Sequence, residues 1–206
     1  TIQAALDATP ASLVTADEQW DILIDESAAG VTEWSSTSTI TVPSRTTDAT
    51  RFIRIKPNTG KSFKDSANKL TNALRYNASN GVGLTKSTAF GNVLQCGAAY
   101  TRIEGIQVRC GHPLQDPYIE TAGNVTTRDC IFEADSQHEG TVYQQAALAF
   151  QGSGGSRMIN CVVAGNSAIS TWSGSGTVEF RNCSFIRQGS AASQANGYCV
   201  YNNATV

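Results

Sequence analysis

Four short segments of the chain repeat one pattern of apolar and polar residues. Each has an anchor residue and a second apolar residue two positions later, so both side chains lie on one face of an extended strand. The anchors are Ile106, Cys130, Cys161 and Cys183, and the paired apolar residues are Val108, Phe132, Val163 and Phe185. The anchors are 24, 31 and 22 residues apart, a spacing typical of stacked repeats. The pattern predicts a β-solenoid, in which each strand buries its apolar face against its neighbours.

The residue before each anchor is polar or glycine. These residues are Gly105, Asp129, Asn160 and Asn182. Amides stacked at matching positions form hydrogen-bonded ladders in cross-β structures. We therefore expect a side-chain ladder along the last three repeats, interrupted at Gly105.

Further strands are predicted around these repeats. Short apolar segments at residues 118–121, 147–150, 168–171 and 198–201 are expected to form a second sheet, with two or three strands in each coil. Upstream strands are expected at residues 20–25, 39–43, 50–56 and 93–96. The first eight residues are predicted to form an amphipathic helix with Thr1 as its N-cap. A helix here would cover the first exposed strand edge of a solenoid.

The predicted organisation is a single β-helix domain over residues 1–206. It comprises a capping helix at 1–9, the first coils at 20–56, a loop-rich insertion at 57–88 with a short strand at 74–76, and regular coils at 93–206. A strand-like segment just before Val206 leads us to expect a fragment of a longer chain.

Composition excludes some partners. With 15 basic and 17 acidic residues the net charge is −2, which gives no electrostatic attraction for nucleic acid or an anionic membrane. No apolar run approaches the ~18 residues of a membrane helix. Six cysteines without a C-x-x-C pair are interpreted as buried free thiols, which favour assembly in a reducing cytosol, with disulfides between coils as the alternative.

Several segments carry a resemblance to known proteins. Residues 1–8, followed by a strand at 22–25, resemble the entry of right-handed parallel β-helix proteins of the pectate-lyase-like superfamily. The segments Asn160-Cys161-x-Val163 and Asn182-Cys183-x-Phe185 are similar to the repeats of that group. Residues 46–55 resemble a segment of β-helix proteins encoded by bacteriophages.

The resemblance implies an all-β fold, a right-handed parallel β-helix with a short N-terminal capping helix. It also implies a non-enzymatic structural protein of a phage virion, acting as a capsid decoration, fibre or spike, with adhesion to host-surface glycans as a further role. The implied partners are other capsid or tail proteins and sister chains, for example in a trimer. The implied location is the virion, which is assembled in the host cytoplasm and is extracellular when mature.

The alternative is a tailspike-like polysaccharide depolymerase, either a lyase or a glycoside hydrolase. Enzymes of this superfamily need acidic residues clustered on one outer face. The candidate residues are Asp129, Glu133, Asp135, Glu139, His138 and Arg128. Their spacing does not bring them together by itself, and solvated charges are the competing interpretation. A carbohydrate-binding module without turnover is a third hypothesis.

No cofactor or metal site is predicted. The stretch from Phe52 to Ser62 ends in Gly60-Lys61-Ser62 and looks like a phosphate-binding loop, but Ile55 stands where that loop needs its first glycine. A basic turn is the better interpretation. His112 has no carboxylate or cysteine partner at a fixed spacing, so it does not indicate a metal site. We expect the loops at 57–88, 111–117 and 133–145 to contact partners.

Overall fold

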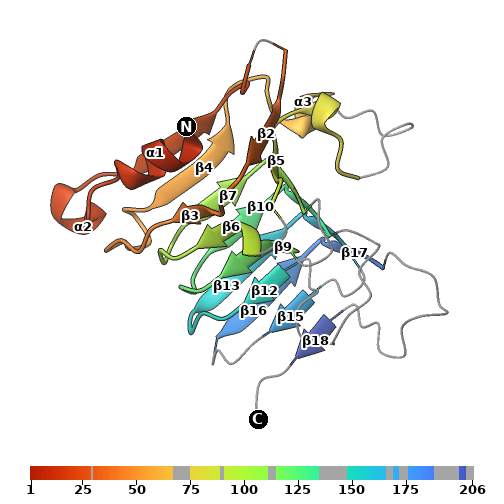
Figure 1. The fold of residues 1–206 in the computed structure, drawn as a ribbon. Helices are drawn as coiled ribbons and strands as arrows, with labels where there is room; N and C mark the ends of the chain where they lie inside the picture. Colours follow the sequence, from red (N-terminus) through yellow and green to blue (C-terminus); the bar gives the residue numbers. More distant parts are fainter. Residues whose placement is uncertain are drawn as a thin grey trace.

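A computed structural model shows parallel strands stacked in three sheets (Figure 1). It describes residues 1–28, 30–66, 75–88, 91–110, 115–134, 148–165, 169–171, 176–187 and 200–202. Sheet A contains β1 (Trp20–Ile24), β4 (Ile53–Pro57), β7 (Arg102–Glu104), β10 (Thr126–Arg128), β13 (Gly155–Ile159) and β16 (Thr177–Arg181). Sheet B contains β2 (Glu33–Ser36), β5 (Gly83–Lys86), β8 (Gln107–Cys110), β11 (Ile131–Glu133), β14 (Val162–Gly165) and β17 (Ser184–Arg187). Sheet C contains β3 (Ile40–Val42), β6 (Gly91–Cys96), β9 (Gln115–Glu120), β12 (Leu148–Phe150), β15 (Ile169–Thr171) and β18 (Val200–Asn202).

From β1 to β15, each strand pairs in parallel with the strand three places later in the chain. The chain thus visits sheets A, B and C in turn, and we call one such passage a coil. This arrangement confirms the predicted mostly-β chain of stacked parallel strands and is compatible with a β-solenoid. Three strands per coil, rather than two, form the sheets.

The register of sheet B confirms the alignment of the sequence repeats. Val108 pairs with Phe132, Phe132 with Val163, and Val163 with Phe185. Because successive strands lie ~4.8 Å apart, side chains at these positions form one continuous inward row, which is buried from Val108 to Val163 and half-buried at Phe185. Leu84 extends the row toward the N-terminus.

Each repeat is two strands and not one, because a corner separates sheet A from sheet B. The corner residues Gly105, Asp129, Asn160 and Asn182 have φ of +66°, +54°, +54° and +51°. Glycine, asparagine and aspartate are the residues that adopt this left-handed conformation at low cost. Gly105 therefore continues the series of left-handed corners, although it has no side chain to join the expected ladder.

The corner amides hold neighbouring coils together. The N–H groups of Gly105, Asp129 and Asn160 donate to the carbonyl groups of Arg128, Ile159 and Arg181, at 3.0, 2.9 and 2.9 Å. One contact of the expected side-chain ladder is present, from Asn160 Nδ2 to Asp129 Oδ1 at 3.1 Å. The backbone conformation is thus the main reason for these residue types.

The interior between the sheets is mainly apolar. Ile55 and Ile103 from sheet A, Leu84 and Phe132 from sheet B, and Leu94 from sheet C are all buried. Of the cysteines in the described part of the chain, Cys96, Cys110, Cys130 and Cys161 are buried, Cys183 is half-buried, and none of the five forms a disulfide. The interpretation as buried thiols is confirmed for the first four, whereas Cys183 is only half-buried. The cysteine side chains pack as small apolar groups.

The N-terminal helix forms as predicted and covers an edge of sheet C (Figure 1). Helix α1 (Ile2–Asp7) begins after Thr1, whose Oγ1 accepts a hydrogen bond from the Ala4 amide at 3.2 Å. Gln3 Nε2 donates to the Thr41 carbonyl at 3.0 Å, and the Thr41 amide donates to Gln3 Oε1 at 2.7 Å. The Gln3 side chain therefore satisfies the edge of β3 as a neighbouring strand would.

The insertion at 57–88 contains more regular structure than expected. It includes α3 (Phe63–Ser66), a 3-10 turn (Ala78–Asn80) and strand β5. The strand predicted at 74–76 is wrong for Arg75 and Tyr76, which have irregular backbone, while Leu74 lies outside the described residues.

The insertion packs on the outer face of sheet B. Phe63 and Tyr76 contact Ile131, Val162 and Ile186 in a second apolar cluster. The Gln107 side chain is buried beneath the insertion and bonds the Asn77 amide at 2.8 Å and the Asn77 carbonyl at 3.0 Å. The insertion therefore buries part of the outer face of sheet B.

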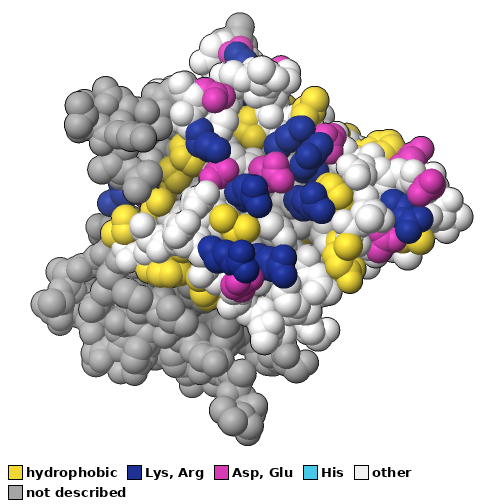
Figure 2. All heavy atoms as spheres, turned by 180° about the vertical axis from the view of Figure 1, so that it is seen from behind, with side chains coloured by type: hydrophobic (Ala, Val, Ile, Leu, Met, Phe, Trp, Pro, Cys, Tyr) yellow, Lys and Arg dark blue, Asp and Glu magenta, His cyan; other side chains and the backbone are white. Residues whose placement is uncertain are grey.

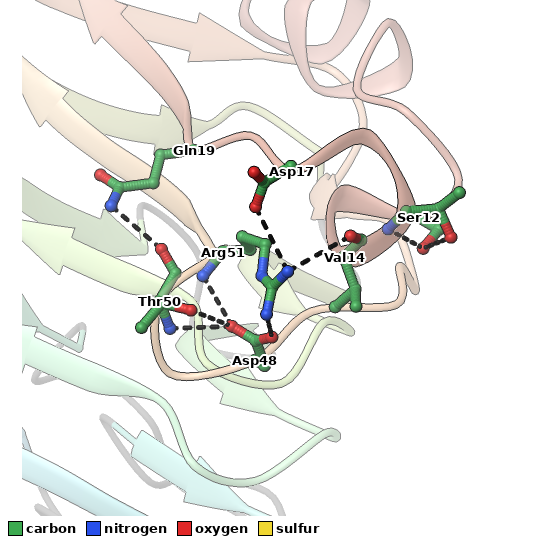
Figure 3. A network of polar contacts seen from close by, with 8 residues as sticks. Ser12, Val14, Asp17, Gln19, Asp48, Thr50 and Arg51 are labelled. Carbon is green, nitrogen blue, oxygen red and sulfur yellow. Dashed lines mark hydrogen bonds and ion pairs between the residues drawn. The ribbon is translucent and has the colours of Figure 1, made fainter.

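A polar network ties the N-terminal segment to the turn before β4 (Figure 3). Asp48 Oδ1 accepts hydrogen bonds from the Thr50 amide, the Thr50 hydroxyl and the Arg51 amide, each at 2.8 Å. Asp48 Oδ2 pairs with Arg51 at 2.8 Å, and Arg51 also contacts Asp17 at 3.3 Å. The bonds from Thr50 and Arg51 hold the pKa of Asp48 well below its usual range. Helix α2 (Leu13–Ala16) lies beside this network.

Replacing the corner residue Asn160 tests the left-handed corner. Asn160→Val is expected to lower the free energy of unfolding by roughly 1–2 kcal/mol, because a β-branched side chain clashes with the backbone at positive φ. Asn160→Gly keeps the conformation accessible and should lose at most about half as much. Urea unfolding of both variants measures the difference. Equal losses would contradict the conformational role of the corner.

A matched pair of isosteric substitutions tests the network in Figure 3. Asp48→Asn should lower Tm by a few degrees, because an amide cannot accept from both the turn amides and Arg51. Asp17→Asn is the control, since the Asp17 side chain is 87% exposed, and it should shift Tm by less than about 1 °C. Thermal unfolding followed by circular dichroism measures both. A larger effect at Asp17 would show that the turn at Asp48 does not anchor this segment.

Candidate functional site

Two of the residues predicted for a depolymerase, Asp129 and Glu133, form ion pairs within the protein. Asp129 lies at a corner, where its carboxylate binds Lys64 Nζ at 2.8 Å. Glu133, at the end of β11, is buried and binds Arg75 Nε at 2.9 Å, the Tyr76 amide at 3.2 Å and Arg109 Nε at 3.8 Å. Both carboxylates thus anchor the 57–88 insertion.

Arg128, the other candidate within the described residues, does not join them. Arg128 is exposed at the end of β10, in sheet A rather than sheet B. Asp135, His138 and Glu139 lie outside the described residues, as does His112. Of the candidates among the described residues, the structure therefore brings Asp129 and Glu133 to the insertion, where each pairs with a cation of that segment.

The basic turn at Gly60-Lys61-Ser62 makes contacts within the protein. The Lys61 ammonium forms an ion pair with Glu26, and Ser62 Oγ donates to the Gly105 carbonyl at 3.1 Å. These bonds link the turn to the β1–β2 connection and to a corner.

A groove on the outer side of sheet A is a site that sequence reasoning missed. It lies where β7, β10 and β13 begin, and its volume is about 230 Å³. It is lined by Ala49, Tyr100, Arg102, Asn124, Thr126, Gly155 and Arg157. Arg102 pairs in register with Thr126, and Thr126 with Arg157, so the three side chains share one outward row.

The two arginines of the groove are held in different ways. The Arg102 guanidinium lies 3.6 Å from the centroid of the Phe52 ring and donates to the Ala49 carbonyl at 3.2 Å. Arg157 is 62% exposed, and its Nε lies 3.3 Å from Glu179 Oε2. Arg102 is therefore fixed against the protein, while Arg157 is tethered at one nitrogen.

The loops before the strands complete the groove. Tyr100 and Asn124 have φ of +55° and +56°, and the Tyr100 side chain is exposed. Asn124 Oδ1 accepts a hydrogen bond from the Gly155 amide at 2.9 Å. The groove thus combines two cations with an aromatic ring, an amide and a hydroxyl.

The outer face of sheet A carries more basic than acidic side chains. Figure 2 shows Lys and Arg side chains gathered on this face around a few acidic ones. The strands of sheet A contribute the basic residues Arg54, Lys56, Arg102, Arg128, Arg157 and Arg181 and the acidic residues Asp21, Glu104 and Glu179. Arg54 binds both Asp21 oxygens and Lys56 binds one, which lowers the pKa of Asp21. Asp21 is therefore paired with two cations, and the other basic residues of this face, Arg102, Arg128, Arg157 and Arg181, lie further along the stack with Glu104 and Glu179.

One carboxyl group lies inside the stack. Glu120, at the end of β9, is 2% exposed and lies in register between Cys96 and Phe150. The Ser156 hydroxyl donates to Glu120 Oε1 and accepts from the Val125 amide at 3.1 Å, while Glu120 Oε2 has no hydrogen-bond partner among the described residues. Burial raises the pKa of Glu120 to about 7.

Comparison with protein-family models, with curated proteins and with solved structures found no match. The function of this chain is therefore argued from the geometry and from the resemblance of its segments.

A signal for the groove was present in the sequence. The residues four positions before each anchor are Arg102, Thr126, Arg157 and Glu179. They are polar or charged in every repeat, as expected for an outward row of a stacked sheet.

Glu120→Gln tests the buried carboxyl group through the pH dependence of stability. The pKa of Glu120 is about 7 in the fold against 4.5 when unperturbed, so the stability of the natural protein should fall as pH rises from 4.5 to 7 and then level off. The pKa difference corresponds to about 3 kcal/mol. Glu120→Gln should remove this slope and be the more stable protein at pH 8.

Urea unfolding at pH 4.5, 6 and 8 measures this slope. Glu18→Gln is the control, because Glu18 is exposed, and it should keep the slope of the natural protein. An unchanged slope in Glu120→Gln would contradict the interior placement of a titrating Glu120.

Proposed function

We propose that the chain is a right-handed parallel β-helix with a structural, non-enzymatic role in a bacteriophage virion, as a capsid decoration, fibre or spike. The observation that supports this most is the parallel pairing of each strand from β1 to β15 with the strand three places later, in three sheets. Such stacking bonds the backbone of each coil to the coils beside it. A protein built this way resists unfolding and proteolysis, which suits a particle outside the cell.

The ion pairs that Asp129 and Glu133 form with the insertion support a structural role. Catalysis by a carboxylate pair needs two groups that face the substrate and differ in protonation. Asp129 and Glu133 instead hold Lys64 and Arg75 of the insertion, and Glu133 is only 8% exposed. Their chemistry is that of structural ion pairs.

The phage context rests on the resemblance of residues 46–55. In the fold this segment forms the turn of Figure 3, around Asp48 and Arg51, and the start of β4. The partners we propose are capsid or tail proteins, sister chains in a homo-oligomer such as a trimer, and glycans of the host surface.

Quantitative mass spectrometry of purified particles from the source tests the virion role. The proposal predicts that the chain is found in the particles at a fixed ratio to the major capsid protein. A ratio near one indicates a head decoration, and a few copies per particle indicate a fibre or spike. Absence of the chain from intact particles would overturn the virion role.

A second assay separates the structural role from a depolymerase. The purified chain is incubated with surface polysaccharide of the host, and new reducing ends and unsaturated ends are measured. The proposal predicts no turnover above a heat-denatured sample. Release of oligosaccharides that Glu133→Gln or Asp129→Asn abolishes would identify an enzyme.

A further inference from the structure

We propose that the groove on sheet A binds an acidic saccharide, with a carboxylate or sulfate group of the sugar between Arg102 and Arg157. The proposal deepens the adhesive role put forward above and rests on it. It names the ligand class, the face of the fold and the residues that make the contacts.

The spacing of the two arginines favours a ligand larger than a single small ion. Arg102 and Arg157 flank Thr126 on consecutive strands of sheet A. Since parallel strands lie about 4.8 Å apart, the two Cα atoms are separated by about 10 Å. A saccharide of one or two units reaches both side chains and Thr126 between them, and each guanidinium matches the planar geometry of a carboxylate.

The groove is partly organised before a ligand arrives. Stacking on Phe52 and the bond to the Ala49 carbonyl fix the Arg102 guanidinium. Glu179 Oε2 lies 3.3 Å from Arg157 Nε and restrains that side chain beside the groove. Side chains that are already ordered lose little conformational entropy on binding.

The neutral parts of the groove suit sugar hydroxyl groups and ring faces. Thr126 and Asn124 provide a hydroxyl and an amide beside the arginines, and the exposed Tyr100 ring provides a flat apolar surface. Arginine, amide and aromatic groups together are complementary to a charged sugar rather than to a bare anion.

The charge around the groove argues against nucleic acid. Glu104 and Glu179 lie on the same face among the arginines, and the whole chain has a net charge of −2. A continuous polyphosphate backbone would meet these carboxylates, whereas a glycan with separated acidic groups is accommodated.

Isothermal titration calorimetry of the full chain tests the proposal with defined probes. The probes are an oligogalacturonate, which carries carboxylates, a heparin oligosaccharide, which carries sulfates, and a neutral dextran oligosaccharide of similar length. We expect binding of at least one acidic probe, weakened by added salt, and no binding of dextran. The two acidic probes separate carboxylate from sulfate recognition.

Two variants and one control locate the binding. Arg157→Gln should weaken affinity for the acidic probe about tenfold or more, because it removes a charged contact to the ligand. Arg128→Gln removes the same charge from the same face outside the groove lining, and should change affinity less than about twofold. Gly155→Phe should block the groove without changing charge, since a Cβ at Gly155 meets only Thr177 Oγ1 at 3.6 Å and Asn124 Oδ1 at 3.9 Å.

The outcomes that would overturn the proposal are distinct from those for the virion role. Binding lost equally in Arg128→Gln and Arg157→Gln would show diffuse attraction to the basic face, and no binding of either acidic probe by folded protein would reject the groove as a saccharide site. Circular dichroism checks that each variant is folded. If Gly155→Phe does not fold, the affinity of Arg157→Gln alone decides whether the groove is the binding site. If the chain is found in particles but does not bind an acidic saccharide, the virion role stands and the groove is rejected as a saccharide site. If the chain binds the saccharide but is absent from particles, the saccharide site stands and the virion role is rejected.

Discussion

The left-handed corner between sheets A and B is the constraint on which the rest of the stack depends. At Gly105, Asp129, Asn160 and Asn182 the chain turns through positive φ, and the first three corner amides bond to the next coil. Because the side-chain period of a strand is two, a shift of one residue at any corner would send the buried row of sheet B outward. The corners thus align Val108, Phe132, Val163 and Phe185.

The same alternation that fills the interior generates the outer surface of sheet A. Ile103, Thr127 and Met158 point inward and are buried, so their neighbours must point outward in matching rows. One such row carries Arg102 and Arg157. The interior restricts its residues to those that stack, whereas the outer rows are free to vary and to carry a binding function.

The repeat positions could be read from the sequence because they obey a local rule. The anchors and their apolar partners recur with strand periodicity, which predicted the register of sheet B and the strands at β9, β12, β15 and β18. The strands β2 and β5 were not predicted, because Leu84 is the only large apolar residue in β5 and serines follow Trp34 in β2. These two strands form through pairing with neighbouring coils and not through their own pattern.

Features that depend on contacts between residues far apart in the chain could not be predicted from the sequence. The interpretation of Asn160 as part of an amide ladder followed from its residue type, but its conformation required the corner. Burial of Glu133 under Arg75 required knowing that the insertion folds back on sheet B. The groove required three coils to place Arg102 beside Thr126 and Arg157.

Amide hydrogen exchange of the corner residues, followed by NMR, tests the stacked architecture most directly. The amides of Gly105, Asp129 and Asn160 occupy turn positions, yet each donates to the neighbouring coil. The account predicts exchange as slow as that of the central strands, and much slower than at Thr59, whose amide bonds only the Asn58 side chain. Fast exchange at all three corners would contradict the stacking of the coils.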